Sequence, residues 1–365
     1  MPGRANSHSE LYFDYQRFVS FTRIVRAIET TTTTTCPFGT WNLNATTVAG
    51  GNGVGNAKDQ LRWPNDLAID SNQDIYVADT DNQRIQKWSA GSSSGITVFP
   101  TNGFPLSYPT ALFLDQNKYL YISDDFNFRI LKWAIDGSEA VRIVAGGNGS
   151  GNGLNQIHSC HGIFVDNNSN VYVSDYYNHR VVKWIPGSSS GIVVAGGNGH
   201  GSELNQLFKP MGIFVTSDDV VYVADTLNHR IMKWVPDYLS GVVVAGENGS
   251  GSNLNQLKNP SSVSVDLYGN VYVSDITSSR IMKWTPGAID GTIMSSDLSG
   301  PFGLKFDKYN NLYVADSDNN RIQKFSFSST SCNAGEQFMT TTTNQSVLKT
   351  MCIITLGFVS WRLIL

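Results

Sequence analysis

The stretch of the sequence that decides the fold is VYVSDYYNHRVVKW, residues 171–184. Both of its ends are rich in β-branched and aromatic residues, which favour buried strands. Between them, Asp175, Asn178 and Arg180 form a short polar connection. The stretch therefore predicts two antiparallel strands joined by a tight turn.

The same frame occurs six times along the chain. In each copy an aspartate ends one strand and an arginine begins the next. The pairs are Asp79 and Arg84, Asp124 and Arg129, Asp175 and Arg180, Asp225 and Arg230, Asp275 and Arg280, and Asp316 and Arg321. By subtraction, successive arginines are 45, 51, 50, 50 and 41 residues apart. This period is typical of a four-stranded propeller blade, so we predict an all-β fold, a six-bladed β-propeller with antiparallel blades.

Two copies of the frame match a known signature well. They read Asn178-His179-Arg180-Val181 and Asn228-His229-Arg230-Ile231. The repeat resembles the NHL repeat, which is named for an Asn-His-Leu-like motif. The resemblance covers roughly residues 43–327 and implies a propeller, but a fold does not by itself imply a function.

Closure of the ring requires a strand from the N-terminal side. The sixth repeat supplies three strands, which end near Phe327, and residues 45–49 match the fourth strand of other blades. We expect this N-terminal strand to close the last blade, because the pairing removes two open sheet edges. Cys36 and Cys332 flank the closure. A disulfide between them would stabilise the ring by at most about 5 kcal/mol, and two unrelated thiols are the alternative.

Three domains are predicted. Residues 1–35 form an unstructured or short-helical segment, residues 36–332 the propeller, and residues 333–365 a threonine-rich linker with an apolar tail. The tail resembles a GPI-attachment signal, with a membrane anchor or a disordered end as alternatives. Sequons for N-glycosylation occur at Asn44, Asn148, Asn167, Asn248 and Asn344. We therefore expect an extracellular or cell-surface location, although no signal peptide is recognisable.

The recurring polar residues are interpreted as structural. A residue that every blade carries serves a need of every blade, and the Asp, Asn and Arg of the frame would satisfy backbone and side-chain groups around one turn. The glycine-rich loops, such as residues 50–55, are interpreted as turns, because a phosphate-binding loop would need a following helix.

The positions that vary between repeats form the candidate site. One set begins the inner strands: Asn65, Asp66, Thr110, His161, Met211, Ser261 and Phe302. The other set lies in the turns: Thr80, Asp81, Asp125, Phe126, Tyr176, Tyr177, Thr226, Leu227, Ile276, Thr277, Ser317 and Asp318. We expect both sets on one face, around the mouth of the central channel. Aromatic residues there favour protein or sugar recognition, and packing between neighbouring turns is the alternative. The predicted partner-binding residues are Phe126, Phe128, His161, Tyr176, Tyr177, Met211 and Phe302.

The function predicted from these features is a non-catalytic scaffold that binds a protein or glycan partner. One alternative resembles peptidyl-hydroxyglycine lyase, whose propeller holds zinc through several histidines. Only His161 clearly begins an inner strand, and His179 and His229 fill the ordinary repeat position before arginine. A zinc site needs several ligands, so we expect no zinc and no other cofactor. A calcium ion held by channel carbonyls stays open.

A second alternative is an RNA-binding or ubiquitin-ligase-associated NHL module. A RING domain needs more zinc ligands than this chain's four cysteines supply in any recognisable pattern. The net charge of −4 argues against a phosphate-binding surface, because such surfaces cluster Lys and Arg. We therefore do not expect a nucleic-acid partner, whereas the apolar tail leaves membrane attachment open.

Overall fold

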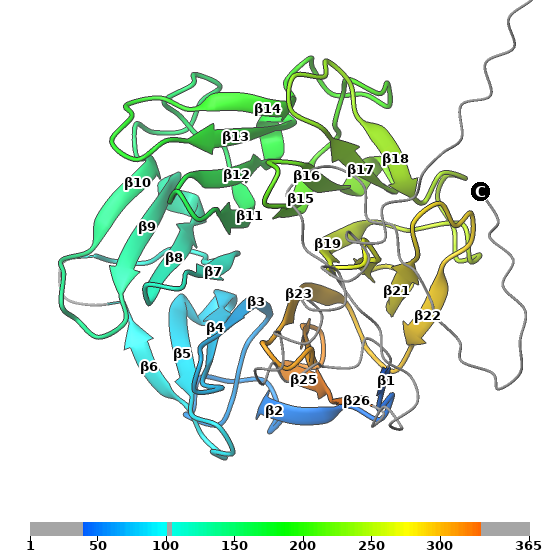
Figure 1. The fold of residues 1–365 in the computed structure, drawn as a ribbon. Helices are drawn as coiled ribbons and strands as arrows, with labels where there is room; N and C mark the ends of the chain where they lie inside the picture. Colours follow the sequence, from blue (N-terminus) through cyan, green and yellow to red (C-terminus); the bar gives the residue numbers. More distant parts are fainter. Residues whose placement is uncertain (1–38, 101–103, 330–365) are drawn as a thin grey trace, which may run out of the picture. The chain divides into compact units, whose positions relative to one another are not determined.

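The computed structural model describes residues 39–100 and 104–329. Six four-stranded antiparallel sheets are arranged in a ring (Figure 1), which confirms the predicted six-bladed propeller. The predictions for residues 1–35 and 333–365, Asn344 and the Cys36–Cys332 disulfide lie outside the described residues. No helix in the described part has the length and apolar character needed to cross a bilayer.

Each blade runs from an innermost to an outermost strand. Blade 1 comprises β3 (Pro64–Ile69), β4 (Ile75–Asp79), β5 (Arg84–Trp88) and β6 (Ile96–Phe99), and blade 2 comprises β7 (Leu112–Leu114), β8 (Tyr119–Asp124), β9 (Arg129–Ala134) and β10 (Arg142–Gly146). Blade 3 comprises β11 (Cys160–Val165), β12 (Val171–Asp175), β13 (Arg180–Trp184) and β14 (Ile192–Gly196), and blade 4 comprises β15 (Pro210–Val215), β16 (Val221–Asp225), β17 (Arg230–Trp234) and β18 (Val242–Ala245). Blade 5 comprises β19 (Pro260–Val265), β20 (Val271–Asp275), β21 (Arg280–Trp284) and β22 (Thr292–Ser295).

Blade 6 is completed from the other end of the described chain. It comprises β23 (Pro301–Phe306), β24 (Leu312–Asp316), β25 (Arg321–Phe325) and β2 (Thr46–Gly50). Strand β2 pairs antiparallel with β25, from Thr46 opposite Lys324 to Gly50 opposite Arg321. The N-terminal strand therefore closes the ring, as predicted.

A further two-stranded sheet was not predicted. It pairs β1 (Gly39–Trp41) with β26 (Phe327–Ser329). Trp41 holds it against the blades, because its ring lies 5.7 Å from that of Tyr272 and its indole N–H donates to the carbonyl of Asn310 at 3.0 Å. Strands of three residues are too short to show a period in the sequence.

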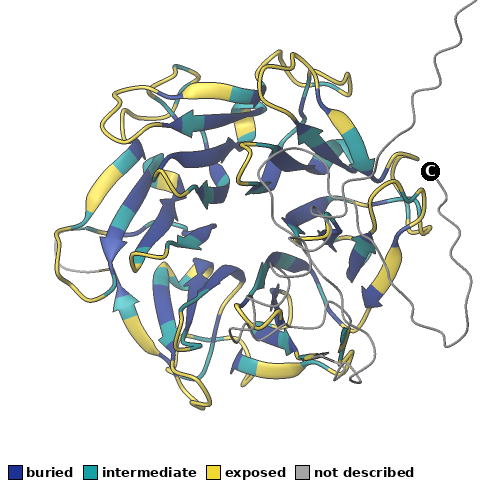
Figure 2. Cartoon of the chain, viewed as in Figure 1, coloured by how far each residue is buried: buried dark blue, intermediate teal, exposed yellow. Residues whose placement is uncertain are grey.

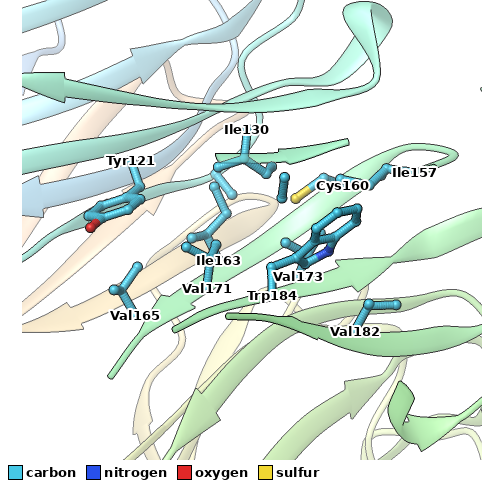
Figure 3. Packing of buried hydrophobic residues seen from close by; sticks show 12 residues of the cluster. Tyr121, Ile130, Ile157, Cys160, Ile163, Val165, Val171, Val173, Val182 and Trp184 are labelled. Atoms are coloured by element: carbon cyan, nitrogen blue, oxygen red, sulfur yellow. The ribbon is translucent and has the colours of Figure 1, made fainter. Parts of the chain in front are cut away.

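The core lies between neighbouring blades. Figure 3 shows the cluster between blades 2 and 3, where Ile130 packs with Cys160, Ile163 and Trp184. The two middle strands of the blades are mostly buried, whereas the outermost strands carry exposed residues (Figure 2). Burial of this kind contributes roughly 25 cal/mol per Å² of apolar surface, so each blade is stabilised mainly by its neighbours.

The recurring aspartate and arginine form an ion pair in all six blades. The Arg Nε lies 2.6–2.9 Å from an Asp carboxylate oxygen. In blade 3 the same Asp175 carboxylate accepts the backbone N–H of His158 at 2.8 Å, and Arg180 donates to the carbonyl of Asn152 at 2.8 Å. The pair thus fastens the loop before the inner strand to the turn after the second strand.

A second side-chain contact also recurs in every blade. A tyrosine on the second strand lies opposite a lysine on the third, for example Tyr172 opposite Lys183. The six lysine ammonium groups lie 5.0–5.7 Å from the tyrosine ring centroids. Cation–π contacts of this geometry contribute about 0.5–1 kcal/mol each at partly exposed positions.

Candidate functional site

A small cavity lies where the innermost strands begin. Its volume is about 20 Å³, which leaves room for about one water-sized group. The side chains that line it include Asn65, Asp66, Thr110, His161, Met211, Ser261, Ser262, Phe302 and Lys305. Every position in the set predicted to begin the inner strands therefore lies at this cavity.

One side of the cavity is polar. The Asp66 carboxylate accepts the backbone N–H of Leu112 at 2.9 Å and lies 3.2 Å from the Lys305 ammonium. Its other oxygen, Oδ1, and Oδ1 of Asn65 are buried and have no hydrogen-bond partner among the described residues. Burial raises the pKa of Asp66, because a buried carboxylate loses its hydration. Two acceptor atoms therefore remain without a donor.

Gly303 makes room for this carboxylate. A Cβ atom at residue 303 would lie 2.2 Å from Asp66 Oδ1 and 2.9 Å from the Asn65 carbonyl oxygen. No side chain fits at that distance, so the close approach of blades 6 and 1 requires glycine here.

The opposite side of the cavity carries His161. Its ring centroid lies 4.6 Å from that of Tyr176. Burial lowers the pKa of His161 to about 4, because the charged imidazolium would lose its hydration. The imidazole is therefore neutral at physiological pH and behaves as one more flat, weakly polar ring.

An aromatic row extends outward from His161. We define it as Phe128, His158, His161, Tyr176 and Tyr177. Neighbouring ring centroids lie 4.6 Å apart for His161 and Tyr176, 4.9 Å for Tyr176 and Tyr177, 4.8 Å for Tyr177 and His158, and 6.2 Å for His158 and Phe128. Tyr177 is 48% exposed, so the row connects the cavity with the surface.

Two further groups accompany the aromatic row. The Lys209 ammonium lies 5.4 Å from the Tyr176 ring and 5.2 Å from the Tyr177 ring. Phe126, which is 60% exposed, stacks on Tyr108 at 4.7 Å with an angle of 4° between the rings. The rings over blades 2 and 3 are thus held in place by one another.

The structure distributes the predicted partner-binding residues over three places. Phe128, His161, Tyr176 and Tyr177 belong to the aromatic row. Phe126 stacks on Tyr108 beside it. Met211 and Phe302 line the cavity, where Met211 is almost fully buried and Phe302 lies 6.3 Å from Trp63.

Sequence reasoning missed several residues of this face. Trp63, Tyr108 and Lys209 each come directly before the proline that leads into an inner strand, with φ values of 54°, 57° and 55°. They vary between repeats, as the predicted positions two residues later do, so the same comparison, begun two residues earlier, would find them. Lys305 lies further along the inner strand, where blade 1 has Ala68.

The predicted turn positions do not all face the site. Four 3₁₀ turns follow the second strands: η1 (Thr80–Asn82), η2 (Asp125–Asn127), η3 (Tyr176–Asn178) and η4 (Thr226–Asn228). Thr80 Oγ1 donates to the Pro109 carbonyl at 2.6 Å, and Thr226 Oγ1 donates to the Pro260 carbonyl at 2.8 Å. These side chains join neighbouring blades. In blade 3, Tyr176 takes the position instead and contributes its ring to the aromatic row.

The described residues do not form a zinc site of the lyase type. Within residues 39–100 and 104–329, no three His, Cys, Asp or Glu side chains gather closely enough to hold a metal ion. His161 has a tyrosine ring as its neighbour rather than further ligands.

The NHL repeat pattern matches the sequence at residues 61–88, 158–184 and 298–325. These segments fall in blades 1, 3 and 6, and each ends with the third strand of its blade. The chain is an NHL-repeat propeller. None of the curated proteins compared with its sequence matches it.

Solved structures share the fold of this NHL-repeat propeller. A structural genomics protein of unknown function from Bacteroides thetaiotaomicron has a TM-score of 0.59 at 17% identity, over 80% of this chain and 77% of that one. An auxiliary nutrient binding protein from the same organism has a TM-score of 0.59 at 14% identity, with coverages of 78% and 76%. A gluconolactonase from Xanthomonas campestris has a TM-score of 0.56 at 14% identity, with coverages of 74% and 88%. Both binding and enzymatic roles therefore occur on this fold.

Proposed function

We propose that this NHL-repeat propeller is a non-catalytic binding protein that holds a glycan or protein partner on the aromatic row and the adjoining cavity mouth. The observation that carries the proposal is the aromatic row itself. Its five rings come from three separate segments of blades 2 and 3, at residue 128, residues 158–161 and residues 176–177, yet each ring centroid lies within 6.2 Å of the next.

The row has the properties of a recognition surface. Aromatic side chains bury large areas and lose little conformational entropy on binding, which is why they dominate binding energy at many interfaces. Tyr177 of the row remains about half exposed, as does Phe126 on its stack with Tyr108, and both have apolar surface still to bury. The other rings lie beneath or beside them and fix their orientation.

The chemistry of His161 supports binding rather than catalysis. A histidine that acts as a general base is normally oriented by a carboxylate or another polar partner. In the described part of the chain, the His161 side chain has no hydrogen-bond partner and contacts the Tyr176 ring. Burial holds its pKa near 4, so it is a weak base at neutral pH.

The experiment exchanges the turn of blade 3 for that of blade 4. Tyr176→Thr/Tyr177→Leu installs Thr226 and Leu227 of blade 4 at the equivalent positions, so the variant keeps a turn that this protein already folds. Glycan-array binding and pull-down from a native extract would be compared between the wild type and this variant. We expect at least a tenfold loss of affinity, since a hot-spot aromatic contributes about 2 kcal/mol.

The matched control removes an exposed tyrosine from the other end of a blade. Tyr268 lies in the turn between β19 and β20 and is exposed, and blade 3 has Asn168 in the same turn position. Tyr268→Asn is expected to bind as the wild type does. Equal binding by Tyr176→Thr/Tyr177→Leu and the wild type, or turnover of a small substrate with no bound partner, would contradict the proposal.

A further inference from the structure

We infer that the cavity at the inner end of the aromatic row is a subsite for the terminal hydroxyl-bearing end of a neutral saccharide. This inference rests on the proposed function, because it names the ligand class that the same face would take. It is carried by the cavity lining and the unpartnered atoms there.

Two buried acceptors have no donor. Asn65 is 4% exposed and Asp66 is 6% exposed. Oδ1 of each residue lacks a hydrogen-bond partner among the described residues, and both residues line the cavity. Buried polar atoms are normally paired, since an unmade hydrogen bond is costly. Both atoms are closed off from solvent, so the lining must shift slightly for a ligand's hydrogen-bond donor to reach them, and the bond would then remove that cost.

The charge of the cavity selects a neutral ligand. The Lys305 ammonium lies 3.2 Å from the Asp66 carboxylate, so the two formal charges offset each other. A metal ion or ammonium group would be repelled by Lys305, and a carboxylate would be repelled by Asp66. A hydroxyl group can donate to an acceptor oxygen and accept from an ammonium group at the same time. A hydroxyl group is therefore the group that matches both partners.

The size of the cavity sets how the ligand enters. A volume of about 20 Å³ admits about one oxygen-sized group. A whole sugar ring does not fit inside, so only the end of a chain reaches Asn65 and Asp66. His161 and Phe302 also line the cavity and offer flat faces for the C–H side of the terminal ring. The rest of a longer glycan would follow the aromatic row outward.

The test uses the full chain and a panel of neutral monosaccharides and disaccharides, together with the matching uronic acids and amino sugars. Saturation-transfer NMR would detect binding, and calorimetric titration would measure affinity. We expect a neutral saccharide to bind and its charged counterparts to bind more weakly. Asn65→Ser and Asp66→Ser are each expected to weaken binding about tenfold, as the loss of one buried hydrogen bond predicts.

These two variants are compatible with the fold. Blade 5 carries Ser261 and Ser262 at the equivalent positions. Ser262 Oγ accepts the backbone N–H of Leu304 at 3.3 Å, just as Asp66 accepts that of Leu112. A serine at residue 66 can therefore keep the bond between blades 1 and 2.

The outcomes separate this inference from the proposed function. If a saccharide binds and Tyr176→Thr/Tyr177→Leu weakens it but Asn65→Ser and Asp66→Ser do not, the cavity subsite is overturned and the binding face stands. If a protein is captured on the aromatic row and no saccharide of the panel binds, the subsite is likewise overturned. If the serine variants weaken saccharide binding and the turn variant does not, the subsite stands and the aromatic row is overturned.

Discussion

Nδ1 of His179 accepts a hydrogen bond from the backbone N–H of Lys209, 3.1 Å away in the next blade. His229 accepts the N–H of Asn259 in the same way at 3.2 Å, and in blade 6 Oδ1 of Asn320 accepts the N–H of Trp63 at 2.9 Å. The histidine of the repeat signature is therefore an acceptor that ties one blade to the inner strand of the next.

Exchanging this acceptor should show its contribution to stability. His179→Asn keeps an acceptor that blade 6 already uses, and we expect its free energy of unfolding to lie within about 0.5 kcal/mol of the wild type. His179→Ser should lose about 1 kcal/mol, the net worth of one hydrogen bond. Ser279 has a φ of 52° at the same position in blade 5, so the turn tolerates serine. Urea unfolding gives the free energy of unfolding of each variant, and equal values for His179→Asn and His179→Ser would contradict the assigned role.

The same histidine should make stability depend on pH. Burial, with the nearby charges of His200 and Lys209, lowers the pKa of His179. A histidine whose pKa is lowered by folding contributes stability that is present above its unfolded value of about 6.5 and is lost as the pH falls through the folded value. Measured as wild type minus His179→Asn, the unfolding free energy should therefore decrease from pH 7 to pH 5. A difference that stays constant over this range would refute the linkage.

Asp125 should show the opposite dependence on pH. Its carboxylate accepts the N–H of Cys160 at 2.6 Å and the hydroxyl of Ser159 at 3.0 Å, and burial raises its pKa to about 6. Stability from a raised carboxyl pKa is fully present below about 4 and is lost as the pH rises through 6. Asp125→Asn retains an acceptor and carries no charge. We expect it to be more stable than the wild type by roughly 1–3 kcal/mol at pH 7 and equally stable at pH 4, as measured by urea unfolding at the two pH values.

Neutralising one charge of the repeat's buried ion pair should cost far more stability than neutralising one charge of a surface pair. Asp175 is fully buried beside Arg180, and Asp175→Asn leaves that guanidinium without its counter-charge. Such a loss costs about 3–5 kcal/mol. Glu139 and Arg142 lie 2.6 Å apart, closer than the 2.9 Å between Asp175 and Arg180, but they are largely exposed, so Glu139→Gln should cost less than about 1 kcal/mol. Thermal unfolding of the two variants provides the comparison, and similar losses would show that the buried pair is replaceable.

The sequence predicted what all blades share. Six Asp and Arg frames predicted the blades, and the strand at residues 45–49 predicted the closure. A contact that every repeat makes in the same way places the same residue types at a fixed spacing, and that spacing is visible in the sequence. The opposed Tyr and Lys also recur at a constant spacing, from Tyr172 to Lys183 for example, so this contact too is encoded in the period of the sequence.

The candidate site was harder to predict, because it consists of departures from the repeat. Variation alone does not tell Tyr176, which contributes to the aromatic row, from Thr80, which bonds the next blade at the equivalent position. His158 belongs to the row and Lys209 lies near its two tyrosines, and they come from the loops before different inner strands. Whether these residues come into contact depends on how neighbouring blades pack, and the sequence of a single repeat does not show that packing.

The pairing of β2 with β25 also determines the order in which the protein can be completed. During synthesis β2 leaves the ribosome before any other strand of the six blades, and its partner emerges only with the last repeat. Blades 1 to 5 can pair their own strands as they emerge, since domains and repeats fold from the N-terminal side. Strand β2 must wait, with its edge unpaired, until β25 arrives. A ribosome that stalls before Arg321 therefore leaves an open array with two exposed edges, and such edges are prone to aggregate.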